Sequence, residues 1–97
     1  MLYYSIETLY YFSKAISLIE KVIDNNLIKT SNSTTVYYIE QYRFKNIMNI
    51  LDAIFKLIED FSNKMDIFKT DKSLEITMTN IKSMYMELKS KSKEYMN

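Results

Sequence analysis

The sequence predicts an all-α fold, an antiparallel three-helix bundle with a long central helix. Apolar residues recur at spacings of three and four along three segments, which puts them on one face of an α-helix. Short polar runs at 29–35 and 70–73 separate these segments, so consecutive helices are expected to be antiparallel. Gly and Pro, the usual helix breakers, are absent from all 97 residues. We expect one domain over 1–97, with helices near 2–28, 35–69 and 72–96.

The first segment carries two apolar lines instead of one. Its expected core line is Leu2, Ile6, Leu9, Phe12, Ile16, Ile19, Ile23 and Leu27. A second line lies on roughly the opposite face and consists of Tyr4, Tyr11, Ala15, Leu18 and Val22. Either this helix is contacted on both faces by its own chain, or the second line is an interface with a second copy or another protein. Large exposed apolar patches are rare on monomers, which favours the interface.

The middle segment is the longest and the most broadly apolar. Its expected core line is Tyr37, Phe44, Ile47, Leu51, Ile54, Ile58, Phe61, Met65 and Phe68. Apolar residues also stand on both shoulders of that line, with Ile39, Ile50 and Leu57 on one and Met48 and Phe55 on the other. Two intrachain neighbours explain that width, whereas the tyrosines at its start (Tyr37, Tyr38 and Tyr42) form a second candidate protein interface. An unbroken helix here is about 50 Å long against about 40 Å for its neighbours, so it either overhangs them or breaks between Tyr38 and Asn49. No Gly or Pro marks a break, so we expect the overhang.

The third segment begins after Thr70 or Asp71, either of which is a suitable N-cap. Its expected core line is Leu74, Met78, Ile81, Tyr85, Leu88 and Tyr95. A row of three lysines follows one shoulder, and with two earlier cations it gives the candidate phosphate contacts Arg43, Lys45, Lys82, Lys89 and Lys93. Thirteen basic and twelve acidic residues leave a net charge of only +1, which favours a solvated flank over nucleic-acid contact.

The composition argues against an enzyme. The chain has no His and no Cys, the side chains that most often supply acid–base chemistry near neutrality, soft nucleophiles and metal ligands. Its carboxylate groups, such as Glu20 with Asp24, lack the ligand spacing of a di-iron bundle or a calcium loop. We therefore expect no enzymatic activity, no cofactor and no metal.

The predicted function is that of a non-enzymatic, self-associating protein-binding module. Abundant Ile, Lys, Tyr and Asn indicate an AT-rich genome, such as that of a phage, a virus or a low-GC bacterium. By analogy at the level of class, this favours a phage, viral or mobile-element inhibitor of a host defence protein, anti-CRISPR-like and acting by occlusion. A helical subunit of an RNA–protein assembly and a bacteriocin-immunity-type protein are the alternatives. The apolar start lacks a basic region and a cleavage site, and no membrane span is present, so the expected location is intracellular, in the host cytoplasm if the protein is viral.

Overall fold

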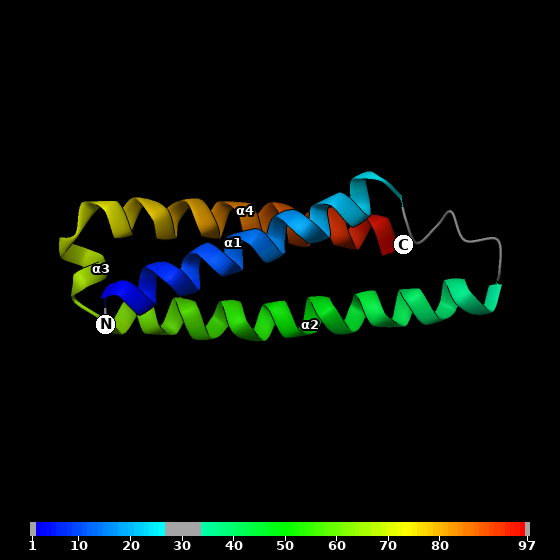
Figure 1. The fold of residues 1–97 in the computed structure, drawn as a ribbon, viewed down its shortest axis with the longest axis horizontal. Coiled ribbons are helices and arrows are strands. Elements are labelled where there is room, and N and C mark those ends of the chain that lie inside the picture. Colours follow the sequence, from blue (N-terminus) through cyan, green and yellow to red (C-terminus); the bar gives the residue numbers. More distant parts are fainter. Residues whose placement is uncertain (1, 27–33, 97) are drawn as a thin grey trace.

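The computed structural model describes residues 2–26 and 34–96, and within them it forms four helices and no strand. These are α1 (Leu2–Asp24), α2 (Thr34–Lys64), α3 (Ile67–Thr70) and α4 (Lys72–Met96). The three long helices run side by side along the long axis of the molecule, and the short α3 connects α2 to α4 (Figure 1). The molecule measures 51 × 21 × 18 Å. The predicted all-α class is therefore confirmed.

Helix α1 ends at Asp24, four residues before the expected end. Asn26 adopts a positive φ of 52°, a left-handed conformation that Asn tolerates better than most residues. The amide of Asn25 still donates to the carbonyl of Lys21 at 3.0 Å, and that of Asn26 donates to Ile23 at 3.0 Å. The tighter last bond and the left-handed residue stop the helix.

The expected middle helix is divided near its end into α2 and α3. The Phe68 side chain of α3 is buried in the core, which fixes this short helix at one end of the bundle. Asp71 then caps α4, because its Oδ1 accepts a hydrogen bond from the Leu74 amide at 3.1 Å. Of the two N-caps that the sequence offered, Asp71 is the one observed.

The core lies between the three long helices and is densest around aromatic rings. All six residues of the expected α4 line are buried (Leu74, Met78, Ile81, Tyr85, Leu88 and Tyr95). The Phe55 ring of α2 stacks on Tyr85 of α4 with centroids 4.4 Å apart and on Phe12 of α1 at 6.1 Å. A second, smaller cluster joins Phe44 and Tyr95, whose rings are 5.6 Å apart.

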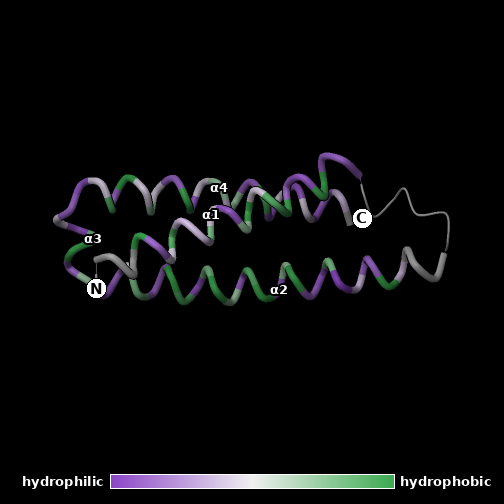
Figure 2. Tube along the Cα trace, in the orientation of Figure 1, coloured by the Kyte–Doolittle hydropathy of each residue, from purple (hydrophilic) through white to green (hydrophobic). Residues whose placement is uncertain are grey.

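The expected core line of α2 is only partly in the core. Phe44, Leu51 and Ile58 are buried as expected. Ile47, Ile54 and Phe61 were expected inside, yet all three are exposed, whereas Phe55, expected on a shoulder, is only 3% exposed. An aromatic ring buries more area than an aliphatic side chain and gains from stacking, so the Phe55 contacts with Tyr85 and Phe12 set the rotation. Hydrophobic residues recur along most of α2 (Figure 2), and several of them remain exposed.

Helix α2 has no break between Tyr38 and Asn49, and its N-terminal end projects past the ends of α1 and α4 (Figure 1). The expected overhang is thus present. Phe44 packs against Tyr95 close to the end of α4, so the turns of α2 that precede Phe44 are the ones that extend beyond the bundle.

Candidate protein-interaction surface

The second apolar line of α1 is divided between core and surface. Ala15 and Val22 are half-buried against the two core clusters, so this part of the line serves the fold. Tyr11 and Leu18 are 62% and 61% exposed, and they lie two turns apart on the same side of α1. The Tyr11 ring meets Tyr10 edge to face at 5.4 Å, and the Lys14 ammonium lies 5.3 Å from the Tyr10 ring centre. An aromatic and aliphatic patch therefore remains on α1.

The second tyrosine patch lies on α2. Tyr38 and Tyr42 are both exposed and stand one turn apart near the projecting end of the helix. Tyr4 and Tyr37, predicted to belong to the same surfaces, lie outside the described side chains. We use the name tyrosine surface for the four described and exposed residues of these two patches, Tyr11 and Leu18 on α1 and Tyr38 and Tyr42 on α2.

The predicted phosphate contacts are mostly placed beside carboxylates. Lys89 Nζ lies 3.2 Å from Asp52, and Lys82 Nζ lies 3.9 Å from Glu59, so both lysines connect α4 to α2. Arg43 pairs with Glu40 one turn earlier on α2 at 3.1 Å. Lys45 and Lys93 are exposed on different helices. The five cations therefore do not form one continuous basic row.

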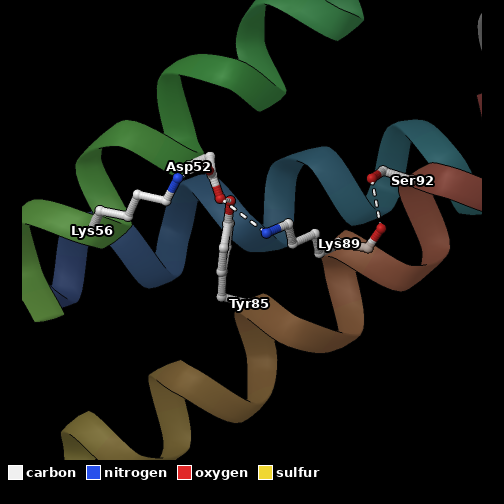
Figure 3. Close-up of polar contacts among 5 residues, drawn as sticks. All are labelled: Asp52, Lys56, Tyr85, Lys89 and Ser92. Atoms are coloured by element: carbon white, nitrogen blue, oxygen red, sulfur yellow. Dashed lines mark hydrogen bonds and ion pairs between the residues drawn. The ribbon is translucent and has the colours of Figure 1, made fainter.

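Asp52 is the centre of a polar group that joins α2 to α4. Its carboxylate accepts a hydrogen bond from the Tyr85 hydroxyl at 2.8 Å and pairs with Lys56 at 3.0 Å and with Lys89 at 3.2 Å (Figure 3). The apolar spacing alone did not predict this group. Tyr85 in the α4 core line was the available signal, since a buried hydroxyl needs a partner. Figure 3 also shows Ser92, whose hydroxyl donates to the Lys89 carbonyl at 2.9 Å.

The chemistry of this polar group is structural. Hydrogen bonds from Lys56, Tyr85 and Lys89 lower the pKa of Asp52 to about 2, which makes it a weaker base. Burial, and then the hydrogen bond to Asp52, raise the pKa of the Tyr85 hydroxyl well above its usual value, which makes it a weaker acid. Both groups are moved away from neutrality, whereas acid–base catalysis needs a pKa near the working pH.

A third apolar surface, which the sequence analysis assigned to intrachain contacts, runs along α2. It consists of Ile47, Ile50, Ile54, Leu57 and Phe61, and we call it the α2 seam. Its spacings of three and four repeat without interruption, as at the a and d positions of a coiled coil. Leu57 is 70% exposed and Ile50 is 59% exposed. Phe61 closes the seam at one end, where its ring packs edge to face on Phe68 of α3 at 6.0 Å.

The contacts between α2 and α4 explain why the seam faces away from α4. Asp52 and Glu59 pair with residues of α4. Ile54 follows Asp52 by two residues and Leu57 precedes Glu59 by two, and two residues turn a helix by about 200°. The seam therefore lies on the side of α2 opposite to the α4 contacts.

Comparison of the chain with protein families, with curated proteins and with solved structures finds no match. None of the described helices is long and apolar enough to cross a membrane. The exposed surfaces described above are therefore the basis for a function of this chain.

Proposed function

We propose that this chain is a non-enzymatic protein-binding module that acts by covering a surface of another protein with its tyrosine surface. The observation that carries the proposal is the exposure of Tyr11 and Leu18 on a helix whose opposite face already fills the core. Tyrosine suits such a surface, because its ring buries area on binding while its hydroxyl stays hydrated when the partner is absent. Tyr38 and Tyr42 add a second anchor of the same kind.

The class of target follows from composition. We propose a host defence protein that is blocked by occlusion, as expected of a small phage, viral or mobile-element inhibitor. An AT-rich coding pattern and the absence of His and Cys support that class, since occlusion needs surface and no chemistry. Hot spots of protein interfaces are enriched in Tyr, which agrees with the residues exposed here.

The test is a pull-down from host lysate with the tagged wild-type chain and with Tyr11→Ala combined with Leu18→Asp. We expect a stoichiometric protein partner that survives nuclease treatment and is lost in the double variant, while the helical circular dichroism is unchanged. Met86→Asp is the matched control, since Met86 is exposed on α4, outside the tyrosine surface, and should retain the partner.

Two results would overturn the proposal. A partner released by nuclease would favour an RNA–protein assembly, with Lys82 and Lys89 among the contacts to test by Lys→Ala changes and salt dependence. Loss of folding in the double variant would show that Tyr11 and Leu18 serve the fold and not a partner.

A further inference from the structure

We infer that the α2 seam binds the α2 seam of a second copy of this chain, in an antiparallel homodimer. This goes beyond the proposed function, because the seam and the tyrosine surface share no residue. Five consecutive a and d positions are apolar and exposed, from Ile47 to Phe61. Two helices pair along such a pattern because each apolar side chain fits between four residues of the facing helix.

The residues beside the seam permit close approach. One flank is the core of the chain itself, where Leu51 and Ile58 are buried. The other flank carries Asn46, Ala53 and Asp60, all exposed. These side chains are short, and Ala53 stands halfway along the seam, so a facing helix meets no long side chain at its centre.

Charge at the two ends of the seam selects the antiparallel direction. Glu40 and Arg43 precede it, and Asp60 and Lys64 stand at its other end. When Ile50 faces Ile54 of the second copy, Ile47 faces Leu57, Arg43 lies beside Phe61 and Asp60, and Glu40 lies opposite Lys64. A parallel pair would instead place Arg43 against Arg43 and Lys64 against Lys64, which is unfavourable.

Rearrangement of the end charges costs little. Within one chain Arg43 pairs with Glu40, and Lys64 with Asp60 at 2.9 Å. Both are exposed pairs within one turn of helix, a kind that contributes little to stability. Their side chains can therefore exchange these partners for the equivalent groups of the second copy.

Disulfide trapping tests the pairing directly, because the wild-type chain has no cysteine. Ala53 lies close to the twofold axis that relates the two copies of the antiparallel dimer. The variant Ala53→Cys should therefore form a covalent dimer under mild oxidation at least tenfold faster than the exposed control Lys93→Cys. Asn46→Cys and Asp60→Cys should each link poorly to themselves and readily to each other when mixed. Equal rates for Ala53→Cys and the control, or preferential self-linking of Asn46→Cys and Asp60→Cys, would overturn the antiparallel dimer.

Sedimentation gives a second, independent readout. The wild-type chain should sediment at twice its monomer mass, and Leu57→Asp at the monomer mass with unchanged helical circular dichroism. Met86→Asp should remain a dimer. If Leu57→Asp fails to fold, disulfide trapping with Ala53→Cys still shows whether the antiparallel dimer forms. A wild-type chain that stays monomeric while Leu57→Asp loses the lysate partner would overturn the dimer and assign the seam to the target, leaving protein binding itself intact.

Discussion

Helices α4 and α2 carry apolar residues at the same spacings but place them differently. The six-residue line of α4 is buried, and two exposed apolar residues off that line, Ile76 and Met86, lie far apart along the helix. Helix α2 buries one line around Phe55 and leaves the α2 seam exposed beside it. A helix that serves only the fold needs one apolar line, so the second line on α2 is the part of the chain that the fold does not explain.

The largest expected difference between the two helices appears in a matched pair of leucines. Leu88→Ala should destabilise the chain by about 3 kcal/mol, because a fully buried leucine leaves a cavity. Leu57→Ala should change the unfolding free energy by less than about 0.5 kcal/mol, as exposed substitutions do. Urea unfolding in dilute solution, where association is absent, measures both. Equal losses would show that the seam is part of the core.

The polar contact that joins the two helices should give a pH dependence at both extremes. The unfolded chain protonates Asp52 near pH 4, whereas the folded chain keeps the carboxylate charged down to about 2. Stability should therefore fall as pH decreases from about 4 to about 2. Asp52→Asn should remove this contribution, so that the thermal midpoint of the variant falls less than that of the wild-type chain between about pH 4 and about pH 2.

At alkaline pH the Tyr85 hydroxyl supplies the corresponding effect. Its pKa is raised in the folded chain, so the unfolded chain loses this proton first and stability falls above about pH 10. Tyr85→Phe should flatten that fall, since the unfolded variant has no hydroxyl to ionise at this position. An unchanged slope would contradict the raised pKa that burial and the hydrogen bond to Asp52 give the Tyr85 hydroxyl.

The smallest expected difference between two matched variants is at the start of α4. Asp71→Ala removes the cap of the Leu74 amide and should cost about 1 kcal/mol. Thr70→Ala is the control, because the Thr70 hydroxyl donates to the carbonyl of Asp66, which precedes the short α3, and not to a group of α4. Urea midpoints of the two variants measure the difference. If both shift equally, Asp71 is not the residue that starts the helix.

The spacing of apolar residues predicted the class of fold and every buried residue of the α4 line, because α4 has only one line to bury. In α2 the spacing placed Leu51 and Ile58 correctly in the core but favoured Ile54 over Phe55, since by hydropathy both are plausible core residues. Which of the two is buried depends on contacts between distant segments, and no local pattern contains these contacts. The Phe55 ring packs on both Phe12 and Tyr85, and Asp52 accepts a hydrogen bond from Tyr85. For the same reason the sequence indicated the exposed Tyr11 and Leu18 but did not separate them from the half-buried Ala15 and Val22.

Helix α4 buries its apolar line in the core of the chain, whereas the α2 seam stays exposed and available to a second copy. The most direct measurement is the thermal midpoint of the wild-type chain over a hundredfold range of protein concentration, beside Leu57→Asp. Mass action predicts a wild-type midpoint that rises with concentration and a variant midpoint that does not. If the wild-type midpoint is independent of concentration and equal to that of the variant, the α2 seam does not bind a second copy.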